Sequence, residues 1–322
     1  MFIEVLILII SLIALIYSAD KFVFGAAAIA RNYGIAPMII GLTIVAMGSS
    51  APEMVVAATA SLQGAPDTAI GNAIGSNITN IALVLGLTAL CKPLAVSSLT
   101  LKRELPILLI VTFIASYMLF DLNFSFIEGL LLMVGFLVFI ISLLMVSIKQ
   151  VKHHKIEDPM ITEAQSEIPE NVNNLVALAW LVFGLVLLPL SANYLVESAT
   201  VIAKALGMSD LVIGLTIIAI GTSLPELAAS VVSIIKKEDD LALGNIIGSN
   251  IFNILAVLAL PGLIAPGVVD SEVASRDVPY MMALTILLFA LCFSRSGHFR
   301  ITRVKGGVIF IGFIVYQYLI FT

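Results

Sequence analysis

The stretch Gly41-Leu-Thr-Ile-Val-Ala-Met-Gly-Ser-Ser-Ala-Pro-Glu53 returns later in the chain as Gly214-Leu-Thr-Ile-Ile-Ala-Ile-Gly-Thr-Ser-Leu-Pro-Glu226. Nine of the thirteen positions are identical, and the second copy lies 173 residues after the first. Each copy places a glutamate in an apolar run, directly behind a proline and neighbouring hydroxyl residues. A charge inside hydrocarbon costs several kcal/mol unless it is paired, so ionisable residues in such runs mark functional sites. We therefore expect one site built from both copies.

Composition places the whole chain in a membrane. Of its 322 residues, 60% are hydrophobic and only 11% are charged, whereas soluble domains are about 25% charged. Apolar runs of roughly 20 residues cross a hydrocarbon layer of about 30 Å. The sequence predicts an all-α integral membrane fold with ten transmembrane helices, at residues 2–24, 36–61, 69–91, 105–122, 126–148, 174–198, 209–235, 241–264, 278–294 and 304–321.

The repeat divides these spans into two halves. Residues 149–173 form the only long polar stretch, typical of a linker. We expect a first transmembrane repeat at residues 1–148 (helices 1–5) and a second at residues 174–322 (helices 6–10). Because five is an odd number, the second repeat must enter the membrane from the opposite side, which is the inverted-repeat architecture of many secondary transporters.

Basic residues predict the orientation. Most Lys and Arg residues fall in the odd-numbered loops, whereas the even-numbered loops hold only Lys204 and Arg276. By the positive-inside rule the odd loops and the central linker are cytoplasmic. We expect a multi-pass protein of the plasma (inner) membrane, with both termini extracytoplasmic and the first apolar run kept as a span.

A second pair of matching motifs adds polar side chains to the site. Gly71-Asn-Ala-Ile-Gly-Ser-Asn-Ile-Thr-Asn-Ile81 matches Gly244-Asn-Ile-Ile-Gly-Ser-Asn-Ile-Phe-Asn-Ile254 at nine of eleven positions. On a helix Ser76 and Asn80 share one face, and Asn72 extends that face by a turn. The glycine pairs favour close helix packing as an alternative reading, and a lone Ser or Asn in a membrane often only bonds a neighbouring helix.

The donor atoms of this site are all oxygens. Pro52 and Pro225 remove a helical hydrogen bond each, so we expect backbone carbonyls near Gly48 and Gly221 to turn inward, as broken helices do where they line a polar cavity. Carboxylates, hydroxyls and carbonyls suit Ca²⁺ and other hard cations. The lack of nearby Cys or His disfavours soft transition metals. The motifs predict transported ions, Ca²⁺ and Na⁺, and no cofactor.

At these residues the sequence resembles the sodium/calcium exchanger family of the cation/Ca²⁺ exchanger superfamily, most closely its compact bacterial members. The resemblance covers nearly the whole chain and rests on the paired G-[ST]-S-x-P-E and G-N-x-I-G-S-N-I-x-N motifs. It implies a core of spans two, three, seven and eight around the ions, with spans one and six as a mobile bundle. It also implies a non-enzymatic antiporter in which Na⁺ influx drives Ca²⁺ extrusion by alternating access. We expect it to act as a monomer.

The resemblance implies twelve ion ligands, six in each half of the chain. They are Ala46 (by its carbonyl), Ser49, Ser50, Glu53, Ser76, Asn80, Ala219 (by its carbonyl), Thr222, Ser223, Glu226, Ser249 and Asn253. Ser49 stands where the family usually has Thr, and keeps the oxygen. Asn253 stands where some prokaryotic members and the potassium-dependent exchangers carry Asp, which argues against K⁺ co-transport and leaves the usual stoichiometry of 3 Na⁺ to 1 Ca²⁺ open.

Three other functions compete with sodium/calcium exchange. A proton/calcium antiporter would carry its acid in a G-N-A-x-E pattern, which this chain lacks. An intramembrane acid hydrolase would use two carboxylates as acid and base, but these acids are surrounded by ligand-type hydroxyls and amides. A passive channel would conduct ions far faster than any exchanger.

Overall fold

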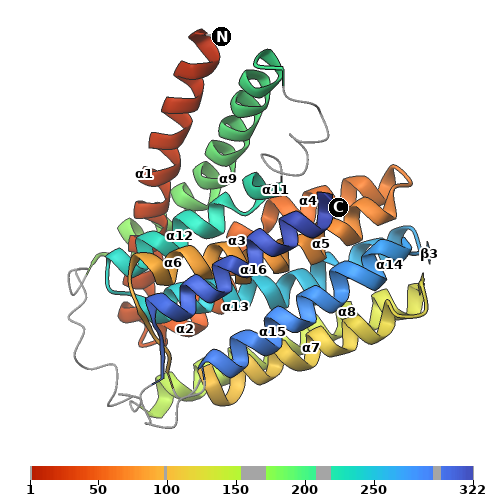
Figure 1. The fold of residues 1–322 in the computed structure, drawn as a ribbon. Coiled ribbons are helices and arrows are strands. Elements are labelled where there is room, and N and C mark those ends of the chain that lie inside the picture. Colours follow the sequence, from red (N-terminus) through yellow and green to blue (C-terminus); the bar gives the residue numbers. More distant parts are fainter. Residues whose placement is uncertain (1, 98–99, 154–171, 208–218, 293–298, 322) are drawn as a thin grey trace.

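The chain folds as a mostly helical bundle in the computed structural model, which describes residues 2–97, 100–153, 172–207, 219–292 and 299–321 (Figure 1). The elements before the central linker are α1 (Phe2–Asn32), α2 (Pro37–Ile40), the π-helical turn η1 (Gly41–Val45), α3 (Ala46–Ser49), α4 (Ala51–Leu62), α5 (Pro66–Thr79), the π-helical turn η2 (Asn80–Leu85), α6 (Gly86–Cys91), β1 (Leu94–Ala95), the π-helical turn η3 (Thr100–Glu104), α7 (Leu105–Met118), β2 (Asn123–Phe124) and α8 (Phe126–His153).

From α11 on, the second half of the chain repeats the order of elements that runs from α3 to α8. It contains α9 (Asn174–Ala205), α11 (Ala219–Thr222), α12 (Leu224–Ile235), α13 (Asp239–Phe252), the π-helical turn η5 (Asn253–Val257), α14 (Ala259–Ile264), β3 (Gly267–Val268), the π-helical turn η6 (Val273–Asp277), α15 (Val278–Cys292), β4 (Arg300–Ile301) and α16 (Arg303–Phe321).

The fold is all-α and membrane-spanning, as predicted. Seven helices of the described chain are long and apolar enough to cross a membrane, and the bent pair Pro37–Ser49 and Ala51–Leu62 would make an eighth. The predicted span at 105–122 corresponds to α7, which has 14 residues. The predicted span at 209–235 falls partly on residues 208–218, which lie outside the described residues. The count of ten spans therefore stays a prediction.

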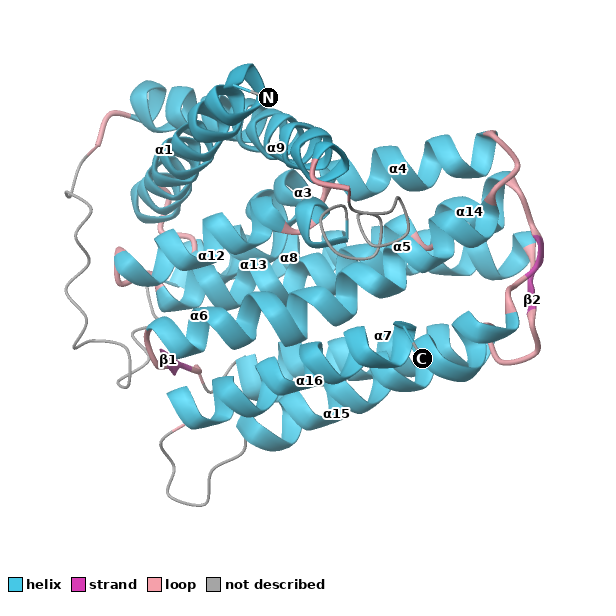
Figure 2. Ribbon diagram, turned by 45° about the horizontal axis from the view of Figure 1, so that its top comes forward, coloured by secondary structure: helices cyan, strands magenta, loops and turns pink. Residues whose placement is uncertain are grey.

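Helices α1 and α9 form a pair of their own, lying side by side and running across the direction of the other helices (Figures 1 and 2). Small residues bring their backbones together: a Cβ added at Gly25 would lie 2.5 Å from Leu181 N, and one added at Gly184 would lie 2.4 Å from Phe22 Cβ. The pair packs in a second apolar cluster, which also takes in Ile40, Val45, Ala229 and Leu241 from the neighbouring helices. Both helices exceed their predicted ends at 24 and 198, which lengthens this contact.

Ion pairs connect α1 to the loop between α12 and α13. Asp20 Oδ1 forms an ion pair with Lys236 Nζ at 2.7 Å, and Arg31 forms an ion pair with Glu238. Asp20 thus lies in the middle of a long helix and has its partner on another element. These contacts hold the α1–α9 pair against the rest of the bundle.

Backbone irregularities recur at the spacing of the sequence repeat. Positions 173 residues apart include the helix breaks at Ser50 and Ser223, the first residues of η2 and η5, the last residues of η3 and η6, and the first residues of β1 and β3. Strand β1 pairs antiparallel with β4, and β2 pairs antiparallel with β3. The two short ribbons lie at opposite ends of the bundle, where β1 and β2 are labelled in Figure 2.

Candidate functional site

Both repeated glutamates follow a break in a helix. Ser50 has φ −88° and ψ 10°, and Ser223 has φ −93° and ψ 7°, so helical geometry stops at each serine. A new helix begins at the next residue, with its proline in the first turn, where a missing N–H has no cost. The first break bends the chain by 46°. Glu53 and Glu226 therefore stand in the first turn of α4 and α12, where the helix dipole favours a negative charge.

The two carboxylates are fully buried and near each other. Glu53 and Glu226 have no exposed surface, and the motif of Glu53 reaches Glu226 through Ser50, three residues before Glu53. Glu226 Oε1 accepts a hydrogen bond from Ser50 Oγ at 2.8 Å. Within the described chain, neither oxygen of Glu53 nor Oε2 of Glu226 has a well-formed hydrogen bond, and no Lys or Arg forms an ion pair with them. Unpaired buried carboxylates are costly, so this arrangement fits a bound cation.

Hydroxyl groups from both halves meet around these carboxylates. Ser76 lies beside the Glu53 carboxylate, without a well-formed hydrogen bond to it. Ser49 Oγ is 3.4 Å from Ser249 Oγ, so the first half contacts the second at this point. The expected ligand positions that the structure places in the buried interior are Ala46, Ser49, Ser50, Glu53, Ser76, Asn80, Ser223, Glu226, Ser249 and Asn253.

Two of the expected ligand positions are described less fully. Thr222 ends α11 and is half-buried. The backbone of Ala219 begins the same short helix, whereas its side chain lies outside the described residues. The residues before it, 208–218, carry the opening of the second motif and are likewise outside the description.

Wide helical turns begin at the two expected asparagine ligands. The π-helical turns η2 and η5 start at Asn80 and Asn253, and both side-chain amides are fully buried. Neither amide has a hydrogen-bond partner among the described residues. Single π-helical turns within α-helices are frequent at functional sites, and no feature of the sequence predicted these two.

Two further asparagines hold the backbone at the site, and the expected ligand set did not include them. Asn72 Nδ2 donates to the carbonyl of Glu53 at 3.4 Å, and Asn245 Nδ2 donates to the carbonyl of Glu226 at 3.3 Å. The two asparagines occupy the same position in the two copies of the second motif. That duplication was the available signal, although hydropathy and spacing alone did not separate them from packing residues.

Helix α9 lies directly over both breaks. A Cβ added at Gly48 would lie 2.3 Å from Leu185 Cδ1, and one added at Gly221 would lie 2.1 Å from Val196 Cγ2. These glycines immediately precede the two hydroxyl residues of each break. The position of α9 therefore controls the space next to the buried carboxylates.

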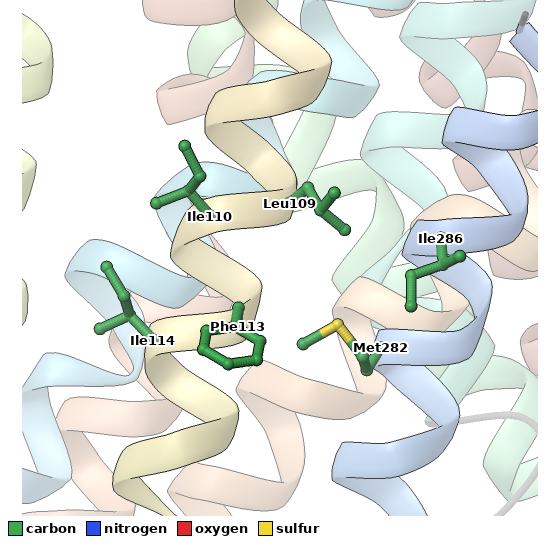
Figure 3. Close-up of a pocket in the computed structure, with 6 residues that line it drawn as sticks. All are labelled: Leu109, Ile110, Phe113, Ile114, Met282 and Ile286. Carbon is green, nitrogen blue, oxygen red and sulfur yellow. The ribbon is translucent and has the colours of Figure 1, made fainter.

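An apolar cavity elsewhere in the bundle has no ligand for an ion. It has a volume of about 320 Å³ and lies between α7 and α15 (Figure 3). Its lining consists of Leu109, Ile110, Phe113, Ile114, Met282 and Ile286. This pocket therefore offers no oxygen to a cation, unlike the buried site described above.

A membrane-spanning helical fold that buries two carboxylates among hydroxyl and amide oxygens defines a cation transporter. The family model of the sodium/calcium exchanger protein matches residues 3–145 and 176–322, so the chain belongs to the sodium/calcium exchanger family. Nearly the whole of both predicted halves is covered by this match.

Individual relatives agree with that family. The chain is 54% identical over 322 residues to the putative antiporter CaxA of Alkalimonas amylolytica, covering 100% of both chains. It is 42% identical to the inner membrane protein YrbG of Escherichia coli, covering 98% of this chain and 95% of that one. A solved structure of the sodium-calcium exchanger NCX_Mj, soaked with Na⁺ and Sr²⁺, matches with a TM-score of 0.80 at 33% identity, covering 98% and 97% of the two chains. The chain is accordingly a cation/Ca²⁺ antiporter and not an enzyme.

Proposed function

We propose that this protein exchanges Na⁺ for Ca²⁺ by alternating access, with Na⁺ influx driving Ca²⁺ extrusion. The observation that carries the proposal is the pair of fully buried carboxylates, Glu53 and Glu226, at two repeat-related helix breaks. Within the described chain neither forms an ion pair with a Lys or Arg. Two carboxylates balance one Ca²⁺, or two Na⁺, at zero net charge. A site that is satisfied by either load, but not by both together, couples the two ions.

The proposed ligands are the oxygens that surround this pair. Hard cations prefer such oxygens, and Ca²⁺ takes about 6–8 of them. The burial of the hydroxyls and the contacts Ser50–Glu226 and Ser49–Ser249 support the assignment. The set comprises the carbonyls of Ala46 and Ala219 and the side chains of Ser49, Ser50, Glu53, Ser76, Asn80, Thr222, Ser223, Glu226, Ser249 and Asn253.

The proposed architecture is ten transmembrane helices in two inverted repeats, residues 1–148 and 174–322, joined by a cytoplasmic linker. The recurrence of breaks, wide turns and strands at the 173-residue spacing supports two repeats. The two strand ribbons support their inversion, because repeat-related strands lie at opposite ends of the bundle (Figure 2). Both termini are then extracytoplasmic, in a protein of the inner membrane that acts as a monomer.

Access to the site is proposed to change through movement of the α1–α9 pair. The close packing of its two helices on each other, and the contacts of α9 with Gly48 and Gly221, support this role. Movement of α9 away from the breaks would open one side of the carboxylate pair. The ion pairs of α1 with Lys236 and Glu238 would then have to lengthen or break.

Proton coupling is the second candidate, because a buried carboxylate can carry a proton as well as a metal ion. We expect proteoliposomes loaded with Na⁺ to accumulate radioactive Ca²⁺ when diluted into Na⁺-free buffer. A pH gradient without Na⁺ is expected to drive no uptake, and empty liposomes serve as the control. Uptake driven by the pH gradient alone would replace Na⁺ by H⁺ as the coupling ion. A current recorded in the same membranes distinguishes electrogenic 3:1 exchange from electroneutral 2:1 exchange.

A further inference from the structure

The amide of Asn245 joins three groups at the site that come from both halves of the chain. Its Nδ2 donates to the carbonyl of Glu226 at 3.3 Å and to Ser230 Oγ at 3.0 Å. Its Oδ1 accepts from Ser49 Oγ at 3.1 Å. A backbone carbonyl can only accept, so the amide atom that faces Glu226 must be the nitrogen. This fixes the amide oxygen toward Ser49.

The direction of the Ser49 proton decides whether that hydroxyl can bind a cation. A serine oxygen carries one proton and two lone pairs, and only a lone pair can face a metal ion. Ser49 Oγ is 3.1 Å from Asn245 Oδ1, 3.3 Å from the Ala46 carbonyl and 3.4 Å from Ser249 Oγ, and it also lies beside the Glu226 carboxylate. Donation to Ala46, Ser249 or Glu226 would occupy an oxygen that is itself a proposed ligand. Donation to Asn245 leaves all of these oxygens free.

We propose that Asn245 is a positioning residue: it accepts the Ser49 proton and thereby turns the lone pairs of Ser49 toward the transported ions. The inference rests on the exchange function proposed above and adds a residue that contacts no ion. Asn245 is fully buried, and both protons of its amide nitrogen are donated, to Glu226 and to Ser230. Its orientation is therefore fixed before any ion arrives.

The other half of the chain offers a matched control. Asn72 is the repeat counterpart of Asn245 and donates to the carbonyl of Glu53 at 3.4 Å, but it is only half-buried. The counterpart of Ser230 is Ala57, which has no hydroxyl, so this second anchor is missing. Only Asn245 is held from two sides, and the positioning effect should be confined to it.

The test measures ion binding and transport in four variants. Asn245→Ala should raise the Ca²⁺ concentration that gives half-maximal flux by about tenfold, equivalent to about 1.4 kcal/mol, with a smaller change in maximal rate. Asn72→Ala should shift it less than threefold. Ser49→Ala should shift it at least as far as Asn245→Ala, and the double variant should match Ser49→Ala alone, because Asn245 acts through Ser49. Shifts that multiply in the double variant, or equal effects of Asn72→Ala and Asn245→Ala, would overturn the proposal.

A milder variant and a second readout keep this test decisive. Ser230→Ala removes one hydrogen bond that holds the Asn245 amide, and this variant is useful even if Asn245→Ala does not fold. It should raise the Ca²⁺ concentration for half-maximal flux about threefold. In a Ser49→Ala background it should cause no further shift. A further shift in that background would count against the proposal. The rise of Tm on adding Ca²⁺ reports binding independently of flux. If the wild-type protein binds Ca²⁺ but shows no Na⁺-driven flux, the proposed exchange function is refuted. The coupling of Ser230 and Asn245 to Ser49 is then still judged from the Tm shifts.

Discussion

Replacing either buried glutamate with glutamine is expected to abolish Ca²⁺ transport. The change keeps the size of the side chain and one oxygen but removes one of the two charges that balance Ca²⁺. Two unit charges about 4 Å apart interact by roughly 4 kcal/mol at an effective dielectric constant of 20, which corresponds to about a thousandfold loss of affinity. We expect no Na⁺-driven Ca²⁺ uptake above that of empty liposomes for Glu53→Gln or Glu226→Gln.

The same variants should make the ion-free protein more stable. Glu53 and Glu226 are fully buried in motifs that contact each other, and among the described residues neither forms an ion pair. Removing one charge relieves the cost of burying it. We therefore expect a higher Tm without Ca²⁺ and no further rise when Ca²⁺ is added. This pair of opposite effects separates loss of a ligand from loss of the fold.

Glu197→Gln is the matched control for this prediction. Glu197 is an exposed acid on α9, so the same chemical change there should leave both uptake and Tm near the wild-type values. Wild-type uptake by Glu53→Gln or Glu226→Gln would contradict the proposed site. A large loss of uptake in the control would show that transport depends on overall charge instead.

The two helix breaks were predictable because their cause is local. A proline behind Gly and hydroxyl residues ends one helix and begins another, and the structure breaks at Ser50 and Ser223 as expected. Burial of the two glutamates followed from their apolar surroundings. The repeat then predicted that both motifs would meet, and the hydrogen bond from Ser50 to Glu226 does join them. Their roles as ion ligands stay predictions.

Other features depend on contacts between distant segments, which periodicity does not reveal. The hydrogen bond from Ser49 to Asn245 joins residues 196 positions apart. The strand ribbons have two residues per strand and no hydropathy signal of their own. The π-helical turns that begin at Asn80 and Asn253 have hydrogen bonds that span one residue more than those of an α-helix. The amino-acid composition of these segments does not reveal this difference. The sequence therefore predicted the chemistry of the site but not the role of Asn245 or the wide turns at Asn80 and Asn253.

Close helix packing was one of the two interpretations of the repeated glycines. For Gly244 and Gly248, in the second half of the chain, this interpretation is confirmed. A Cβ added at Gly244 would lie 2.7 Å from the carbonyl oxygen of Met38, and one added at Gly248 would lie 2.7 Å from Leu42 Cα and 2.8 Å from Ala46 Cβ. Helix α13 thus touches the backbone of the first half directly beside the site. The proposed ligand Ser249 is the next residue along α13.

Gly248→Ala is therefore expected to destabilise the protein and to reduce transport strongly. The nearest atoms are backbone atoms and a Cβ, which cannot rotate away, so α13 must shift from the first half. Overpacking of this kind costs typically 1–3 kcal/mol. The shift also carries Ser249 away from Ser49. In the wild-type structure Ser249 Oγ lies 3.4 Å from Ser49 Oγ. We expect a lower Tm and at least a tenfold loss of Na⁺-driven Ca²⁺ uptake.

Gly307→Ala on α16 is the control for that substitution. The nearest atom to its added Cβ is Leu90 Cδ2, a side-chain methyl at 3.8 Å, which is ordinary contact. Alanine is a better helix former than glycine by about 1 kcal/mol, so Gly307→Ala should keep or raise the Tm and preserve uptake. The same gain is available at Gly248, so a net loss of stability there is a lower bound on the cost of the clash. Unchanged Tm and uptake in Gly248→Ala would contradict this prediction. That result would mean that α13 can move away from the first half without disturbing the carboxylate pair.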